Sequence, residues 1–276
     1  NDAYVNLGIA IKSIRFNSSN VKLYPILIQL INMGNFARPK DLAPSILSLL
    51  KNDPVIKNLL IEENFPKNLK EVNSIIFSLD KIRIIHYLIR ICPLPDLQFE
   101  KFFSNIRSLI LTYIDDIKTS PQFIYFLTTL SLHCFTNEYI YFEKEKETQM
   151  VEKLENEIIQ TFMKSEQPDA KKVLCLASYR PLHQYNWCEK LETLDNIENV
   201  KLRLIEEPSA ERKMMTKIPI IGEISDEVSR KVRMQYEQSP YPRWVKTEIP
   251  TKAKSISEIC TEVNLHLHSN NIKKIF

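Results

Sequence analysis

A short C-terminal segment carries the residue types that best suit an interface. A predicted helix ends at Pro240 and Pro242, and one aromatic residue separates these two prolines. Because proline fixes its own φ and restricts the preceding residue, we expect residues 239–244, here named the YPRW segment, to be stiff and extended. Aromatic and arginine side chains held in this way are typical of interfaces and of lids over ligands. The candidate docking or lid residues are Arg233, Tyr236, Tyr241, Arg243 and Trp244. A packed corner with Trp244 in the core explains the same residues equally well.

The histidines and cysteines form no pattern that predicts a metal site or a nucleophile. His266 and His268 are the closest pair of histidines, and on a helix this spacing sends the two side chains to different faces. His133 and Cys134 are adjacent, so their side chains also diverge. We therefore expect no metal ligands, histidines at the surface, and Cys134 packed in the core.

The carboxylate clusters favour a solvated surface over acid–base catalysis. Glu206, Glu207 and Glu211 lie close in sequence without any partner motif, so we expect them to be exposed. The alternating run of Glu and Lys over residues 143–147 predicts a solvated helix face with local ion pairs. No catalytic residue is predicted in this chain.

Glycine is too scarce for a nucleotide-binding loop. The 276 residues include three glycines, Gly8, Gly34 and Gly222. A Rossmann loop for a dinucleotide or S-adenosylmethionine needs several closely spaced glycines, and a P-loop needs two followed by Lys and Ser or Thr. We therefore expect no cofactor-binding residue in this chain.

Charge and composition favour a soluble cytoplasmic protein. The 37 basic and 34 acidic residues are interspersed and leave a net charge of +3, which argues against a nucleic-acid partner. The absence of a long uncharged apolar stretch argues against a membrane span, and the first residues do not resemble a secretory signal. The scattered cysteines favour reduced, mostly buried thiols; they are Cys92, Cys134, Cys175, Cys188 and Cys260.

Apolar residues recur at three- and four-residue spacing along most of the chain, which predicts amphipathic helices. Asp96 is a predicted cap for the helix that follows it, and residues 200–205 are compatible with a strand or a helix. The expected helices cover residues 2–15, 21–31, 43–50, 57–62, 69–79, 81–91, 97–115, 121–135, 138–164, 170–179, 226–238 and 255–268.

These helices predict an all-α fold, a helix-hairpin array followed by a less regular region. The first domain is expected over residues 1–164. A smaller helical and irregular domain over residues 165–276, with room for one or two short strands, carries the YPRW segment.

Two stretches resemble known families. The first helix, with Gly8 among Ala3, Tyr4, Leu7 and Ala10, is similar to the first helix of a tetratricopeptide (TPR) repeat, where a small residue allows close packing. A second stretch resembles a signature of bacterial TPR-containing class I SAM-dependent methyltransferases; it reads Val232-Arg233-x-Gln235-Tyr236-Glu237-x-x-Pro240-Tyr241-Pro242-Arg243-Trp244. Weaker similarities to the same family follow in order; they are Leu7-Gly8, Arg38-Pro39-x-Asp41, Cys134-Phe135-x-Asn137-Glu138-Tyr139, Ser178-Tyr179-Arg180-Pro181-Leu182, Glu207-Pro208-x-x-Glu211 and Ile224-Ser225-Asp226-x-Val228-Ser229.

The resemblance implies a role outside the catalytic domain. In that family the signature precedes the Rossmann domain, whose glycine-rich loop binds S-adenosylmethionine, and this sequence ends at Phe276, near where that domain should begin. We therefore expect the non-catalytic helical portion of such an enzyme, with S-adenosylmethionine as cofactor of the full-length protein only. Its partner is then the C-terminal methyltransferase domain or another protein. The isolated fragment could self-associate through an apolar patch near Trp244. The alternative is a stand-alone helical protein–protein interaction module.

Overall fold

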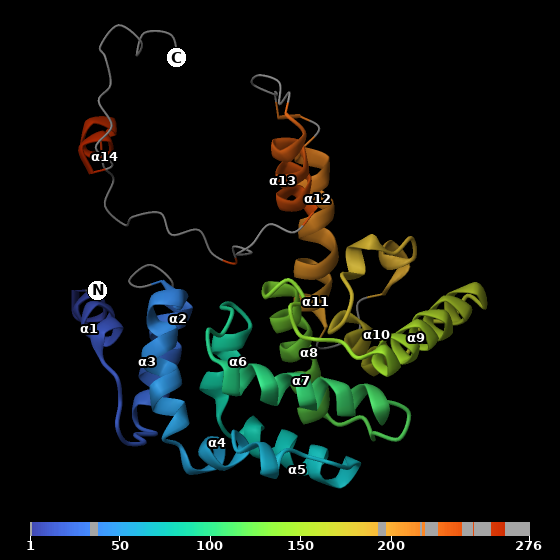
Figure 1. Cartoon of the computed structure of the whole chain (residues 1–276), viewed down its shortest axis with the longest axis horizontal. Helices are drawn as coiled ribbons and strands as arrows, with labels where there is room; N and C mark the ends of the chain where they lie inside the picture. The colour runs from blue at the N-terminus through green and yellow to red at the C-terminus, as the bar shows by residue number, and fades with distance from the viewer. Residues whose placement is uncertain are drawn as a thin grey trace, which may run out of the picture. The chain divides into compact units, whose positions relative to one another are not determined.

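The computed structural model describes residues 2–33, 38–192, 197–215, 217–218, 226–238, 245 and 255–262. Across these ranges the chain is helical and contains no strand, so the predicted all-α fold is confirmed (Figure 1). The chain divides into two compact units, Asn1–Lys246 and Thr247–Phe276.

The helices of the first unit fall into two groups along the chain. The first group contains α1 (Asp2–Ser13), α2 (Leu23–Met33), α3 (Pro39–Lys51), α4 (Pro54–Leu59), the 3-10 turn η1 (Glu62–Asn64), α5 (Leu69–Asp80), α6 (Arg83–Ile89) and α7 (Leu97–Thr112). The second contains α8 (Pro121–Thr136), α9 (Glu145–Met163), α10 (Ala170–Ala177), η2 (Leu182–Gln184), η3 (Cys188–Lys190), α11 (Glu198–Lys201), the π-helix η4 (Leu202–Glu206), α12 (Glu207–Met215) and α13 (Glu227–Gln238). In the second unit the structure describes α14 (Ile256–Glu262).

Helices of the first unit often pack against the helix next but one along the chain. Such pairs are α1 with α3, α5 with α7, α6 with α8, α7 with α9 and α8 with α10 (Figure 1). This arrangement is typical of stacked helical arrays. Gly8 is buried on α1, the helix that packs against α3. The finer TPR-like assignment stays a prediction.

A continuous hydrophobic core joins the helices from α1 to η4, with buried members from Ile11 to Ile205. On α7 the side chains of Phe99, Phe102 and Phe103 are fully buried, and the rings of Phe102 and Phe103 lie edge to face at 5.4 Å. Burying a phenylalanine side chain stabilises a fold by roughly 1.5–3 kcal/mol, so this cluster anchors α7 in the core.

Side-chain caps fix where many of these helices begin. The carboxylate of Asp96 accepts hydrogen bonds from the backbone N–H groups of Gln98 and Phe99, at 3.1 and 3.4 Å. The predicted cap of α7 is therefore confirmed. Further side-chain caps are Asp53 on α4, Asn68 on α5, Ser120 on α8 and Asp169 on α10.

The helix predicted from residue 138 begins later than expected. Glu138 and Tyr139 both have φ of 57°, a left-handed conformation that ends α8, and α9 starts only at Glu145. The backbone N–H of Tyr139 donates to the carbonyl of Cys134 at 2.8 Å, and the ring of Tyr139 packs edge to face on Phe135. The helix end is therefore set by an aromatic contact across the turn.

Residues 200–205 are helical, so the strand alternative is wrong for this stretch. They span α11 and the π-helix η4, with Leu204 and Ile205 buried. Pro208 lies two residues after the end of η4 at Glu206, and it has no N–H to donate to the carbonyl of Leu204, which accounts for the widened helical turn.

The predicted boundary between residues 164 and 165 stays a prediction. On its C-terminal side, α10 packs against both α8 and α9. No helix among the described residues has the length and apolar character needed to cross a membrane.

Candidate functional site

Helix α13 carries the part of the predicted docking site that the structure describes. Arg233 and Tyr236 both lie on it and are exposed. Tyr241, Arg243 and Trp244 lie outside the described residues, so the geometry of the YPRW segment stays a prediction.

The helix exposes a stripe of apolar side chains, here named the α13 stripe and made of Val228, Val232 and Tyr236. Their four-residue spacing places them on one side of the helix. Their exposed fractions are 70%, 45% and 62%. An amphipathic helix with its apolar side in solvent is typical of a helix that binds a partner.

Local interactions on α13 support the helix without a partner. The carboxylate of Asp226 accepts hydrogen bonds from the backbone N–H groups of Val228 and Ser229, at 2.9 and 3.0 Å. Hydrogen bonds from Ser229, and then from Val228, lower the pKa of Asp226. Ion pairs one turn apart join Glu227 to Lys231 and Arg233 to Glu237. Such pairs each contribute about 0.3–0.5 kcal/mol, so α13 is a preformed surface.

The structure also places an unpredicted arginine in the core. Arg107 on α7 is 2% exposed, and its guanidinium donates to the backbone carbonyls of Tyr141, Phe142 and Ser178 at 3.1–3.3 Å. It also lies 4.1 Å from the ring centre of Tyr179. Carbonyl dipoles and an aromatic face therefore balance this buried charge, and they join α7 to the connection between α8 and α9 and to the C-terminal end of α10.

Part of the Glu and Lys run at residues 143–147 is not solvated as predicted. Glu147 is 5% exposed and accepts a hydrogen bond from the hydroxyl of Tyr179 at 2.8 Å. Glu143 pairs with two nitrogens of Arg180, at 2.6 and 2.8 Å, and these hydrogen bonds lower the pKa of Glu143. The prediction of a wholly solvated face is therefore wrong, because the start of α9 packs against residues after α10.

The prediction of surface histidines is wrong for His86 and His133, which are each 1% exposed. The Nδ1 of His133 lies 3.0 Å from the carbonyl oxygen of Ile89, and its Nε2 lies 2.6 Å from the hydroxyl oxygen of Tyr141. Because a carbonyl only accepts, Nδ1 carries the proton and Nε2 accepts from Tyr141. Burial lowers the pKa of His133 to about 4, so this histidine is neutral at pH 7. His266 and His268 lie outside the described residues.

Other predicted side-chain positions are confirmed. Cys134 is fully buried, and burial raises the pKa of its thiol to about 11, which keeps it protonated and unreactive. Glu206, Glu207 and Glu211 are exposed. Within the described ranges, no three His, Cys, Asp or Glu side chains gather closely enough to hold a metal ion, and the expected lack of metal ligands in this chain stays a prediction.

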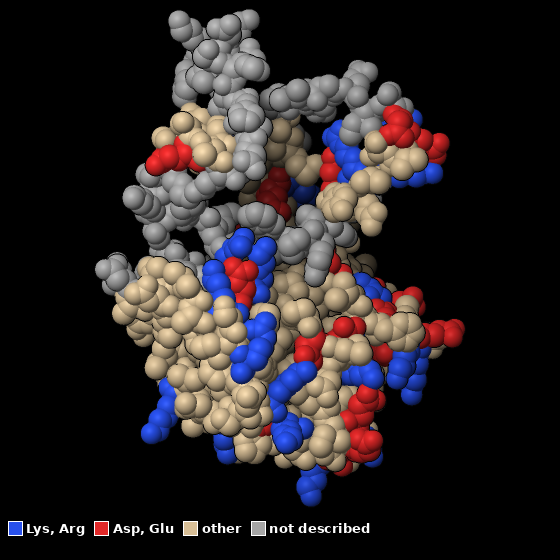
Figure 2. All heavy atoms as spheres, turned by 60° about the vertical axis from the view of Figure 1, so that its left-hand side comes forward, with Lys and Arg blue, Asp and Glu red and all other residues tan. Residues whose placement is uncertain are grey.

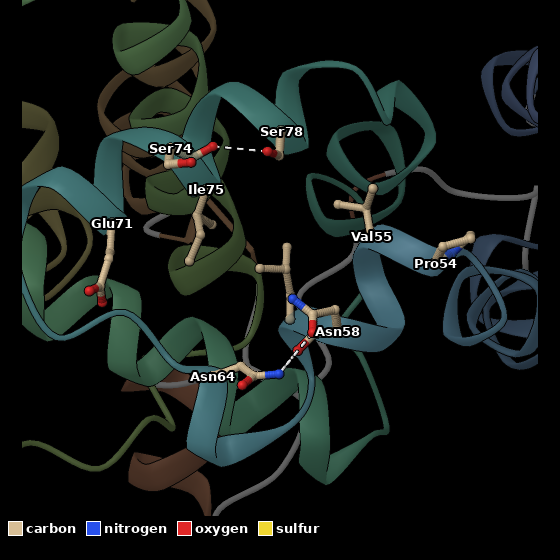
Figure 3. A pocket seen from close by; sticks show the side chains of 9 residues that line it. Pro54, Val55, Asn58, Asn64, Glu71, Ser74, Ile75 and Ser78 are labelled. Carbon is tan, nitrogen blue, oxygen red and sulfur yellow. Dashed lines mark hydrogen bonds between the residues drawn. The ribbon is translucent and has the colours of Figure 1, made fainter.

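An open cavity of about 540 Å³ lies between α4 and α5 (Figure 3). The amide of Asn64 donates to the side-chain oxygen of Asn58 at 2.8 Å across its mouth. Glu71 is held by the backbone N–H of Lys67 and by the amide of Asn68, which together lower its pKa. These polar groups already form hydrogen bonds within the chain, so their arrangement indicates no particular ligand for the cavity. Its lining is Pro54, Val55, Asn58, Leu59, Asn64, Glu71, Ser74, Ile75 and Ser78.

Comparison with known proteins assigns no family. No family model, curated protein or solved structure matches this chain. The resemblance to TPR-containing methyltransferases therefore rests on the quoted residues alone, and α13 is the described part of its signature.

Proposed function

We propose that this chain is the non-catalytic helical portion of a SAM-dependent methyltransferase and that α13 docks it onto the catalytic domain. One observation carries the proposal: the α13 stripe is exposed on a preformed helix that leads into the YPRW segment. The resemblance supplies the partner, since its signature precedes the cofactor-binding domain.

The α13 stripe suits a helix-in-groove contact. Val228, Val232 and Tyr236 give three apolar anchors spaced one turn apart, as in other helices that bind grooves. Because capping and ion pairs already hold the helix, docking costs little conformational entropy. In the complete enzyme this contact would fix the position of the YPRW segment over the cofactor or substrate pocket.

The second candidate is a stand-alone helical protein–protein interaction module. The next-but-one packing of the helices favours it, because stacked helical arrays present extended surfaces to partners. In that case α13 binds a separate protein, and no methyltransferase domain belongs to the same gene product.

Site-specific photocrosslinking in the complete gene product separates these functions. A benzoylphenylalanine replaces Val232 on the stripe, and in a matched control it replaces Arg230 on the opposite side of α13. We expect the probe at Val232 to form a crosslink within the same polypeptide, to a domain that binds S-adenosylmethionine, and the control to form none. Equal crosslinking from both positions, or crosslinks only to other proteins, contradicts docking within one chain.

A further inference from the structure

A cationic face with one tyrosine at its centre lies where α6 packs against α8. The guanidinium carbons of Arg83 and Arg90 lie 5.2 and 4.6 Å from the ring centre of Tyr125. The Nε of Arg90 donates to the hydroxyl of Thr129 at 3.2 Å, which fixes this guanidinium against α8. We name Arg83, Tyr125 and Arg90 the arginine–tyrosine face.

The charge on this face is poorly balanced by the protein itself. Arg83 lies 3.8 Å from the carboxylate of Asp80, and its side chain is 59% exposed. Within the described parts of the chain, no carboxylate forms an ion pair with Arg90. Since like charges repel, an external anion would stabilise this arrangement.

Further contacts hold this face in place at its far end. Arg203 of η4 donates to the backbone carbonyl of Arg90 at 2.5 Å and to the hydroxyl of Thr136 at 3.0 Å. A third guanidinium is therefore anchored to the backbone of Arg90. Neither of these two acceptors carries a charge, and the two hydrogen bonds order this end of the face.

A buried histidine lies under the same tyrosine ring. The ring centres of His86 and Tyr125 are 5.0 Å apart, and the Nε2 of His86 lies 3.1 Å from the carbonyl of Leu79. Nε2 therefore carries the proton, and the buried Nδ1 has no hydrogen-bond partner. Burial lowers the pKa of His86 to about 4; the hydrogen bond to Leu79 and the charge of Asp80 oppose this shift, and the charges of Arg90 and Arg83 add to it. His86 is therefore neutral at pH 7, and the arginines set the charge of the face.

We propose that the arginine–tyrosine face binds an acidic peptide segment of a partner protein. Guanidinium groups form paired hydrogen bonds with carboxylates, and Tyr125 keeps Arg83 and Arg90 oriented by stacking. The face is open and half-exposed, so tight binding requires several carboxylates in a row rather than one small anion. This surface is independent of the α13 stripe, and either proposal can fail without the other.

The rest of the surface argues against a nucleic-acid backbone as the occupant. A nucleic acid needs an extended basic surface, whereas here 37 basic residues are offset by 34 acidic ones. In the view of Figure 2, basic and acidic side chains are scattered over a largely uncharged surface and form no continuous basic block. A short acidic peptide matches a face built around two arginines.

Calorimetric titration of this chain with hexaglutamate, at low ionic strength, tests the proposal. We expect hexaglutamate to bind and hexaglutamine not to bind. The Arg83→Gln/Arg90→Gln variant should weaken binding at least about tenfold, because each arginine supplies charge-assisted hydrogen bonds. The matched control removes two exposed lysines of α4 and α5, as Lys57→Gln/Lys70→Gln, and should change the affinity less than about twofold.

Three outcomes would overturn the proposal. The first is no binding of hexaglutamate by the native chain, and the second is an equal loss of affinity in the arginine and lysine variants. The third is tighter binding of a thymidine oligonucleotide than of hexaglutamate. Arg83→Gln alone keeps the test decisive if the double variant does not fold, because Arg83 is exposed and should weaken binding by itself.

Discussion

At the scale of single residues, the most informative positions are buried polar groups. Arg107, His133 and Glu147 are each at most 5% exposed, and each has a hydrogen-bond partner. These contacts lie inside the core, where catalysis on a substrate would be obstructed. We therefore interpret them as structural supports of the array, and we propose that partners bind instead to α13 and to the arginine–tyrosine face.

Replacing Arg107 by Met should destabilise the fold strongly. The variant leaves the carbonyls of Tyr141, Phe142 and Ser178 without their buried donor. We therefore expect the free energy of unfolding to fall by at least about 3 kcal/mol. Urea denaturation measures this difference. The control Lys153→Met, on the exposed side of α9, should stay within about 0.5 kcal/mol of the native chain, and equal stability of both variants would contradict the structural role of Arg107.

Stability should fall as the pH is lowered from about 6.5 toward 4. Folding lowers the pKa of His133 to about 4, whereas an unfolded histidine titrates near 6.5, so the unfolded chain binds the proton first. The neutral, buried His133 therefore contributes to the free energy of unfolding above pH 6.5. This contribution is lost as the pH falls, and the free energy of unfolding changes by at most about 1.4 kcal/mol per pH unit for this group. His86 acts in the same direction.

The variant His133→Gln isolates this effect. It should be less stable than the native chain at pH 7, because it loses the paired hydrogen bonds of the imidazole, yet its stability should depend less on pH between 6.5 and 4. Urea denaturation at a series of pH values gives both quantities. An unchanged slope would show that His133 does not titrate on unfolding.

At the scale of elements, many helices combine a side-chain cap with an apolar side that faces the core. Asp96 illustrates this, because it caps α7 and also lies 2.5 Å from the ammonium of Lys51 on α3. One side chain thus sets the start of α7 and joins it to an earlier helix. In contrast, α13 has its cap but leaves its apolar stripe exposed, which is why we assign it to docking.

Substitution of Asp96 by Ala should destabilise the fold by about 1 kcal/mol, the usual cost of losing a helix cap. Asp96→Asn keeps the capping oxygen and loses the ion pair, so it should recover most of the stability. Thermal unfolding of both variants measures the difference. If both lose the same amount, the ion pair with Lys51 rather than the cap stabilises α7.

Elements with strong local signals could be predicted from the sequence. The helices expected at residues 69–79, 97–115 and 121–135 match α5, α7 and α8 closely, because apolar periodicity and N-terminal capping residues are encoded nearby. The turn at Glu138 and Tyr139 could not be predicted, because residues other than glycine rarely adopt a left-handed conformation.

The site could be predicted only in part. Exposure of Arg233 and Tyr236 follows from the polarity of α13. Arg107 lies four residues after the buried Phe103, and this spacing indicates that the arginine is on the core side of α7. Its carbonyl partners could not be predicted, because they lie 34–71 positions away in the sequence. The arginine–tyrosine face likewise joins α6 to α8, and such distant contacts leave no local pattern.

At the scale of the whole molecule, the described part of the chain is an all-α array with a continuous hydrophobic core, and the surfaces that we propose for partners lie outside this core. The first unit buries a continuous core from Ile11 to Ile205, and α13 follows beyond that stretch. We propose that α13, a helix outside the core that carries an exposed apolar stripe, is a contact surface for another folded body. The central claim is that this body is a methyltransferase domain.

Hydrogen exchange of the backbone amides of α13 tests this claim most directly. The measurement compares the complete gene product with residues 1–276 alone, and repeats the comparison with Val232→Asp on the stripe and Arg230→Asp on the opposite side. We predict that the amides of α13 exchange more slowly in the complete protein than in residues 1–276. Val232→Asp should abolish this difference, and Arg230→Asp should preserve it. Equal exchange of α13 in the complete protein and in residues 1–276 would contradict the claim.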